Sequence, residues 1–169
     1  MLHVKRIPMT DPLFAQVIDL RVRVLLGPVG WTYEQYLEEL PGREERCEHF
    51  VAVVDHPEGA RVVGTAMLDP ESSVEDGRRL GKVLQVAVDP QMQGQGIGRR
   101  VMVAVEARAM GDPEDGGLGL DGVYCHAQAR AIGFYEQLGW GIQSETFLEA
   151  GIEHKRMGIP GPEKKMKWA

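Results

Sequence analysis

Three alternating glycines followed by two arginines form the segment of this chain whose chemistry is best suited to binding an anion. Residues 91–98 read Gln-Met-Gln-Gly-Gln-Gly-Ile-Gly, and Arg99 and Arg100 follow. Glycine allows positive φ and has no Cβ, so backbone N–H groups around Gly94, Gly96 and Gly98 can converge on one anion at the start of a helix. Arginines in the first turn oppose the helix dipole unless a bound anion offsets them. The segment predicts a phosphate loop, and a plain tight turn with solvated arginines is the alternative.

The residues on either side of the glycines predict the elements that would position such a loop. The β-branched run 83–88, which ends at Asp89-Pro90, is typical of a buried strand. After the loop, apolar residues fall on one helical face: Ile97, Val101, Ala104 and Val105. We therefore expect a strand, a glycine-rich loop and a helix.

Two common phosphate loops do not fit this segment. A nucleoside-triphosphatase loop needs Gly-Lys-Ser/Thr, whereas Gly98 is followed by Arg-Arg-Val. A dinucleotide fingerprint needs Gly-x-Gly-x-x-Gly directly after the first strand. Here the spacing is Gly-x-Gly-x-Gly, and several expected strands precede it.

Three segments resemble the GNAT acyltransferases, which take acetyl groups from acetyl-CoA. Residues 91–96 fit the family's pyrophosphate loop, Gln/Arg-x-x-Gly-x-Gly/Ala. Residues 128–140 resemble its Asn-x-x-Ala-x-x-Phe-Tyr-x-x-x-Gly-Phe pattern, with Gln128 in the Asn position and Trp140 in the final Phe position. Residues 147–157 look like the last hairpin of one branch of small bacterial acetyltransferases. The resemblance covers residues 45–158 well.

The fold class expected from the element order and this resemblance is α/β (α+β). It is the GNAT acyl-CoA N-acyltransferase fold, with a mixed central sheet of six to seven strands and about four helices. One domain is expected over residues 1–159, with a short basic tail at 160–169. The expected strands are 2–7, 47–54, 61–68, one ending at 88, 122–126, 141–147 and 154–159.

Turn and capping residues predict the remaining elements. Asp11-Pro12 is expected to start a helix, with Pro12 at its first position, that ends near Gly27. Thr32 and Gln35 have capping-box spacing, so a short second helix follows. A polar loop is expected over 69–79, and a flexible connection over 111–117.

The resemblance implies which residues hold acetyl-CoA. The amides of the pantetheine arm pair with the backbone of Val86, Ala87 and Val88, although a plain core strand is the alternative. The remaining candidates for cofactor binding are Gln91, Gln93, Gly94, Gln95, Gly96, Ile97, Gly98, Arg99, Gln128 and Tyr135. Gln128 has the alternative role of capping its helix.

The resemblance also implies direct attack of a neutral amine on the thioester, with Tyr135 as the general acid for the leaving thiolate. A phenol of pKa about 10 can protonate a thiolate of pKa about 8.5 only when it lies close to the sulfur. The alternative is that Ala131, Phe134, Tyr135 and Leu138 form a core stripe.

The sequence does not single out one residue as the general base that accepts the proton of the amine. Several family members carry a glutamate on the strand before the loop, but this chain has Gln85, which cannot accept the proton. The candidates are Glu34, Glu149, His126 and His154. Aromatic residues expected near the acceptor are Trp31, Tyr33, Tyr36 and Phe147.

Charge, hydropathy and cysteine content exclude several classes of protein. A net charge of -6 and a pI near 5.4 argue against a nucleic-acid partner. No apolar run approaches a membrane span, so a cytoplasmic protein without a membrane partner is expected.

Cys47 and Cys125 fit reduced, buried thiols. Cys125 and His126 point to opposite faces of a strand and cannot form a dyad. Cys47 and His49 share a face, but too few further ligands exist, and no metal is predicted.

We therefore predict an acetyl-CoA-dependent N-acetyltransferase acting on a primary amine of a small molecule or a protein. The main alternative is a non-catalytic acyl-CoA-binding sensor or partner domain. A generic phosphate-binding α/β protein is weaker because it ignores the second motif. Exposed final strands would suit a homodimer.

Overall fold

The computed structural model describes residues 1–160, so residues 161–169 of the expected basic tail lie outside the described residues. The chain divides into two compact units. Unit 1 comprises Met1–Pro70 and Val83–Glu106, and the described part of unit 2 comprises Glu71–Lys82 and residues 107–160. The expectation of one domain over residues 1–159 stays a prediction.

Eight strands form the sheet in the order β1-β2-β3-β4-β5-β8-β6, with β7 paired to β8. Their bounds are β1 Leu2–Ile7, β2 Glu48–Val54, β3 Arg61–Glu75, β4 Arg78–Val88, β5 Gly122–Gln128, β6 Gly141–Ile142, β7 Phe147–Glu149 and β8 Ile152–Pro160. The described ladders are antiparallel except for β4 with β5. The mixed sheet confirms the predicted fold class. The single strand expected over 141–147 was wrong, because two short strands, β6 and β7, pair separately with β8.

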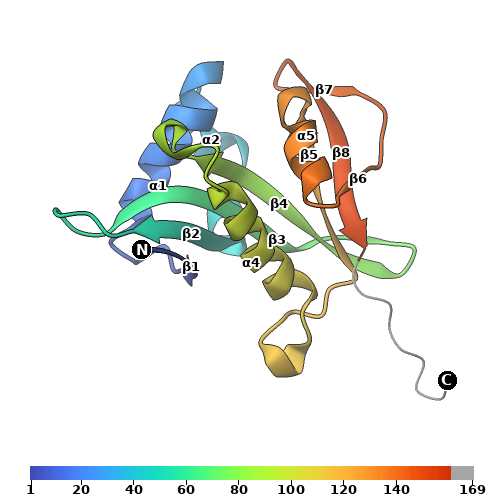
Figure 1. Ribbon diagram of the computed structural model, residues 1–169. Coiled ribbons are helices and arrows are strands. Elements are labelled where there is room, and N and C mark those ends of the chain that lie inside the picture. Colours follow the sequence, from blue (N-terminus) through green and yellow to red (C-terminus); the bar gives the residue numbers. More distant parts are fainter. Residues whose placement is uncertain (161–169) are drawn as a thin grey trace. The chain divides into compact units, whose positions relative to one another are not determined.

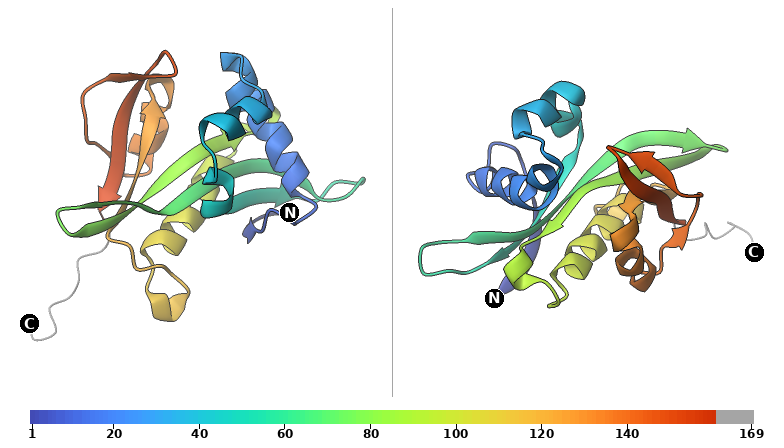
Figure 2. Two further views of the ribbon diagram at one scale, coloured as in Figure 1. Left: turned by 180° about the vertical axis from the view of Figure 1, so that it is seen from behind. Right: turned by 90° about the horizontal axis from the view of Figure 1, so that it is seen from above.

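Five α-helices accompany the sheet among the described residues: α1 Phe14–Arg21, α2 Tyr33–Glu39, α3 Arg43–Arg46, α4 Ile97–Met110 and α5 Ile132–Gln137. In unit 1, α1 and α2 lie on one face of the strands and α4 lies on the other (Figures 1 and 2). None of the helices over residues 1–160 is long and apolar enough to cross a membrane.

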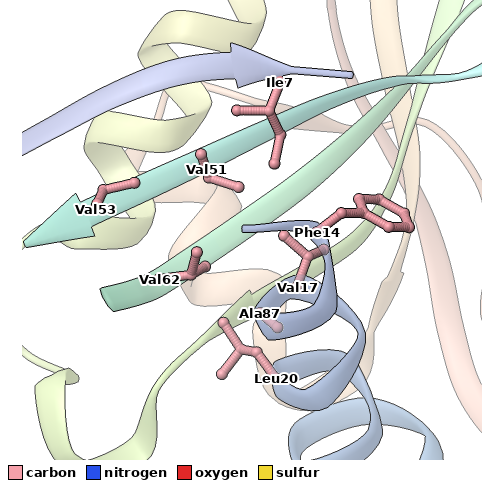
Figure 3. Packing of buried hydrophobic residues seen from close by; sticks show 8 residues of the cluster. All are labelled: Ile7, Phe14, Val17, Leu20, Val51, Val53, Val62 and Ala87. Atoms are coloured by element: carbon pink, nitrogen blue, oxygen red, sulfur yellow. The ribbon is translucent and has the colours of Figure 1, made fainter. Parts of the chain in front are cut away.

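The core of unit 1 forms where α1 packs on the sheet. Apolar residues recur on one face of α1 and meet apolar residues from four strands (Figure 3). The cluster comprises Ile7, Phe14, Val17, Leu20, Val51, Val53, Val62 and Ala87. Removing this apolar surface from water stabilises the unit and fixes α1 against β4, the strand that precedes the glycine loop.

A glycine beside a bulge in β3 lies against α4. Ala52 pairs with Gly64, but Val53 pairs with Val62, so one residue of β3 is left between these pairs. A Cβ added at Gly64 would lie 2.8 Å from Cγ2 of Ile97 on α4. The helix that begins at the glycine loop can approach the sheet because position 64 has no side chain.

The predicted capping box is confirmed, but the predicted cap at Asp11 was wrong, because the N-cap of α1 is Leu13 and it makes no side-chain cap hydrogen bond. The Thr32 hydroxyl accepts from the Gln35 N–H at 3.1 Å, and the Gln35 side chain accepts from the Thr32 N–H at 2.9 Å. The Asp11 carboxylate accepts from the Leu13 N–H at 2.8 Å. However, α1 begins at Phe14, so Pro12 lies in the preceding turn and not at the first helical position.

The polar loop expected over 69–79 was wrong, because β3 and β4 continue through it as a hairpin. Asp76 and Gly77 have φ of 52° and 74°, as a two-residue type I′ turn requires. The strand residues beside the turn are largely exposed and polar. Cross-strand hydrogen bonds, and not burial, therefore define this end of the two strands.

In unit 2, α5 packs on β5 and β8 (Figure 1). The residues buried here include Val123, Cys125, Ala127, Tyr135, Trp140 and Met157. Alternation along β5 sends Cys125 to one face of the strand and His126 to the other.

Candidate functional site

The glycine loop between β4 and α4 leaves its backbone open to a ligand. The Asp89 carboxylate accepts from the Gln91 N–H at 2.9 Å, and the Asp89 N–H donates to the Val63 carbonyl at 2.8 Å, which ties the loop to β3. Gly94 and Gly96 have φ of 81° and 76°. A Cβ at either glycine would meet no atom within 4 Å. Backbone conformation, and not crowding by the protein, therefore requires glycine at these positions.

The first turn of α4 carries no negative charge that would repel an anion. It contains no acidic residue, and its first N–H groups have no partner within the helix. Arg99 is exposed, while the Arg100 guanidinium donates to the Leu2 carbonyl at 3.2 Å. The Ile97 side chain is buried toward Gly64, so Ile97 would contribute only its N–H. Gly98 is helical and not at positive φ, which corrects the expectation for the third glycine.

The three glutamines of the loop, Gln91, Gln93 and Gln95, are all exposed. The Gln93 amide donates to the Val88 carbonyl at 3.5 Å, so its side chain links the loop to the end of β4.

Gln85 interrupts the regular backbone of β4. It has φ of 51°, a conformation that costs a residue other than glycine roughly 1–2 kcal/mol. Its side-chain oxygen is buried and has no hydrogen-bond partner in the described part of the chain. The ladder of β4 with β5 joins Leu80–Lys82 to Gly122–Tyr124, and these pairs all precede Gln85. Val86, Ala87 and Val88 follow the irregularity, and their pairing with the pantetheine amides stays a prediction.

Tyr135 lies on α5 with 6% of its surface exposed, and its phenol contacts the Cys125 thiol. Its ring packs on Phe134 and Trp140 at centroid distances of 5.0 and 5.3 Å. Burial, followed by the contact with Cys125, raises the pKa of Tyr135 well above 10. The shift makes the phenol a weaker acid, so proton transfer to a thiolate requires the phenol to lie close to the sulfur. Its burial also agrees with the core-stripe alternative.

Gln128 does not cap the helix that follows it. Its side-chain oxygen accepts from the Arg130 guanidinium at 3.0 Å, and it makes no cap hydrogen bond to the 3-10 turn Ala129–Ala131. The capping alternative was therefore wrong.

Three of the four candidate bases lie together in unit 2. His126 of β5 and Glu149 of β7 are joined by a 3.0 Å contact between Nδ1 and Oε1. His154 of β8 places its Nε2 3.8 Å from the other oxygen of Glu149. Burial opposes ionisation of Glu149, but the hydrogen bond from His126 and the nearby positive charges outweigh it and lower the pKa of Glu149. Glu34 lies on α2 in unit 1, outside this cluster.

A family model of the acetyltransferase (GNAT) domain matches residues 45–141. This chain belongs to the GNAT acetyltransferase family. The uncharacterized N-acetyltransferase YjcF of Bacillus subtilis strain 168 is 32% identical over 121 residues, which cover 71% of this chain and 75% of YjcF. The uncharacterized protein YyaT of the same organism is 26% identical over 163 residues, covering 92% and 94% of the two chains. The crystal structure of Escherichia coli ElaA covers 94% of this chain and 99% of its own, with a TM-score of 0.69 at 17% identity, and so shares the fold.

The aromatic residues expected near the acceptor of this GNAT protein fall into separate groups. Tyr33 and Tyr36 stack on α2 at 6.0 Å, and the Tyr36 hydroxyl donates to the Met67 sulfur at 3.8 Å. Phe147 instead packs against both histidines of the cluster in unit 2. Trp31 is half-buried just before α2.

The two candidate metal ligands, Cys47 and His49, are both buried. The two ring nitrogens of His49 contact the Arg21 guanidinium at 3.1 Å and the Glu44 carbonyl at 2.8 Å. Cys47 is buried, and burial raises the pKa of its thiol to about 12. Over residues 1–160, no group of three or more His, Cys, Asp or Glu side chains is arranged to hold a metal ion.

Sequence reasoning singled out His126, Glu149 and His154 separately but missed that they form one cluster. Pairing of β7 with β8 places Phe147 opposite His154, and pairing of β5 with β8 places Gln128 opposite His154. The only local signal is the Ala150-Gly151 turn, whose φ values of 52° and 74° fit a tight hairpin.

Proposed function

We propose that this GNAT protein transfers an acetyl group from acetyl-CoA to a primary amine of a small molecule or a protein. The glycine loop carries the proposal, because its two positive-φ glycines face open space at the start of a helix whose first turn has no acidic residue. The N–H groups of residues 94–98 and the Arg99 guanidinium suit the pyrophosphate of the cofactor. The backbone of Val86–Val88 would pair with its pantetheine amides.

The reaction requires a neutral amine nitrogen, a polarised thioester carbonyl and a proton for the departing sulfur. Acetyl-CoA supplies the thioester. The nitrogen forms a bond to the carbonyl carbon while the carbon–sulfur bond breaks, and the sulfur leaves as a thiolate. We assign the protonation of that thiolate to the Tyr135 phenol, and the proton that the nitrogen loses as the amide forms restores the phenol.

A thermal-shift titration with acetyl-CoA, CoA and ATP tests the donor site. A ligand that binds only the folded state stabilises it by about 2.7 kcal/mol at a concentration of 100 times its Kd. A rise in melting temperature with both CoA compounds and none with ATP supports the proposal, and no rise with any of them overturns it.

Gly96→Val is the matched test of the loop. A side chain at φ of 76° is strained and would occupy the open space above the backbone. The control is Gly59→Val, because Gly59 also has positive φ, 115°, with no atom within 4 Å of an added Cβ. We expect only Gly96→Val to abolish acetyl-CoA binding in calorimetry, and equal affinities in both variants would contradict the assignment.

A non-catalytic acyl-CoA-binding domain is the second candidate, favoured by the amide at Gln85 in place of a carboxylate. Release of free thiol from acetyl-CoA, measured with a panel of primary amines, separates the two. An enzyme shows amine-dependent release that Tyr135→Phe reduces at unchanged CoA affinity. A sensor binds acetyl-CoA and releases no thiol above the spontaneous rate. A cytoplasmic location and a homodimer stay predictions.

A further inference from the structure

The cluster of His126, Glu149 and His154 is the group of titratable side chains in unit 2 to which the proposed function has so far given no role. Lys82 of β4 also reaches it, with Nζ 3.4 Å from Nδ1 of His126. The next charged residue is Arg156, directly opposite His126 in the β5–β8 ladder. Its guanidinium lies 4.1 Å from the centre of the Tyr124 ring and pairs with Glu75 at 2.9 Å, which offsets its charge.

The contacts of His126 fix which ring nitrogen carries the proton. Nδ1 can either donate to a carboxylate or accept from an ammonium, but not both. Its contact with Glu149 is 3.0 Å and its contact with Lys82 is 3.4 Å. The shorter contact, to an ionised carboxylate that can only accept, assigns the proton to Nδ1. Nε2 of the neutral ring then carries a lone pair.

The lone pair on Nε2 is available to a ligand. No residue from 1 to 160 hydrogen-bonds to Nε2 of His126, and the side chain is 28% exposed. His49 contrasts with it, because both nitrogens of that ring have partners and only 3% of the residue is exposed. His126, unlike His49, therefore has one ring nitrogen held by a hydrogen bond and one that is open to a ligand.

The surroundings of Glu149 hold the pair in this arrangement. His154 donates from Nδ1 to the Ile152 carbonyl at 2.7 Å, which fixes its ring with Nε2 toward Glu149. The Phe147 ring meets His126 edge-on at 5.0 Å and stacks with His154 at 5.9 Å. Burial alone would raise the pKa of Glu149, but the hydrogen bond from His126 and the charge of Lys82 help to lower it below its usual range, so Glu149 stays ionised at neutral pH.

We propose that His126 is the general base for the amine and that Glu149 is the positioning residue that holds its proton on Nδ1. The proposal rests on the proposed acetyl transfer and assigns its missing proton acceptor. An ammonium substrate gives its first proton to Nε2 of His126, the neutral nitrogen attacks the thioester carbon, and the second proton leaves as the amide forms. One proton reaches the departing sulfur through Tyr135, and the other passes from the His126 imidazolium to water. The sum is one ammonium and one thioester giving one amide, one thiol and one released proton.

Ionised Glu149 stabilises the imidazolium formed during turnover, as the carboxylate of a catalytic triad does.

The test is His126→Gln with His3→Gln as the matched control, because His3 is an exposed histidine of unit 1. Both variants and the wild type are assayed from pH 6 to pH 10 with acetyl-CoA and the primary amine that gives the fastest thiol release. General-base catalysis contributes about 10²- to 10⁴-fold, so we expect a loss of kcat of that size at pH 7 in His126→Gln alone. The deficit should shrink as the pH nears about 10, where an alkylamine loses its proton unaided. Acetyl-CoA affinity should be unchanged in calorimetry.

A structural role would give a different pattern. Wild-type kcat and an unchanged pH profile in His126→Gln would overturn the proposal, and so would a loss equal at every pH. Glu149→Gln keeps an oxygen that can accept from Nδ1 but removes the charge, so we expect an intermediate loss of kcat. A rate equal to the wild type in that variant would refute the positioning role.

Long-range ¹H–¹⁵N NMR of the histidine rings tests the geometry without any substrate. The proposal requires a proton on Nδ1 of neutral His126, and a proton on Nε2 would overturn it. Wild-type protein that releases no thiol with any amine would refute the acetyl transfer itself and, with it, any catalytic base. An active wild type with an unaffected His126→Gln variant would instead refute only this inference.

Discussion

Replacing Glu44 by Gln should destabilise unit 1 more than any exposed charge substitution, because it leaves the buried guanidinium of Arg21 without its counter-charge. Arg21 donates from Nη1 to the two oxygens of Glu44 at 2.8 and 3.0 Å, and both side chains have no exposed surface. The arginine Nε already lacks a partner in the described structure. Removing one partner of a buried pair costs about 3–5 kcal/mol, since the remaining charge is left uncompensated. This is a large share of the roughly 5–15 kcal/mol that stabilises a typical domain.

Urea unfolding at pH 7, followed by far-UV circular dichroism, measures this loss. The matched control is Asp19→Asn, which removes an exposed pair: Asp19 and Arg23 lie 2.9 Å apart with side chains 66% and 48% exposed. That loss should be about 0.3–0.5 kcal/mol. Adding Arg21→Met to Glu44→Gln should recover part of the stability, because no unpaired charge then remains buried. A Glu44→Gln loss no greater than that of Asp19→Asn would refute the reasoning.

Three further predictions follow from the packing and the titratable groups. Gly64→Ala places a Cβ 2.8 Å from Cγ2 of Ile97 and should lower the free energy of unfolding in urea by about 1–3 kcal/mol. An unchanged urea midpoint would mean that α4 can lie farther from β3 without loss of stability. Burial lowers the pKa of His49 below 6.5. Below about pH 6.5 the unfolded chain therefore binds a proton that the folded protein does not bind. The free energy of unfolding should have its full value above about pH 6.5 and fall at lower pH by at most about 1.4 kcal/mol per pH unit. His49→Gln should flatten that dependence, and equal slopes would contradict it. Burial raises the pKa of Cys47 and of Cys125 to about 12. Neither thiol should therefore react with a thiol reagent at pH 8 until urea unfolds the protein. Fast labelling of the native protein would be inconsistent with this burial.

Local signals in the sequence predicted the elements that depend on neighbouring residues. The capping box at Thr32 and Gln35 formed as expected, because both hydrogen bonds join residues three apart on one turn. The loop glycines at 94 and 96 adopted positive φ, because glycine lacks the steric penalty that other residues meet there. The hairpin at Asp76-Gly77 was missed, because its strands are polar and exposed and pairing defines them.

The sequence by itself determined the GNAT family, the mixed α/β fold and the glycine loop, since these depend on residue order and on backbone preferences along one segment. Only the tertiary structure decided which distant side chains meet. The pairs His126–Glu149, Tyr135–Cys125 and Arg21–Glu44 join residues from different elements. Strand order, ladder register and helix packing set those contacts, and a one-residue shift in register would send each strand side chain to the opposite face.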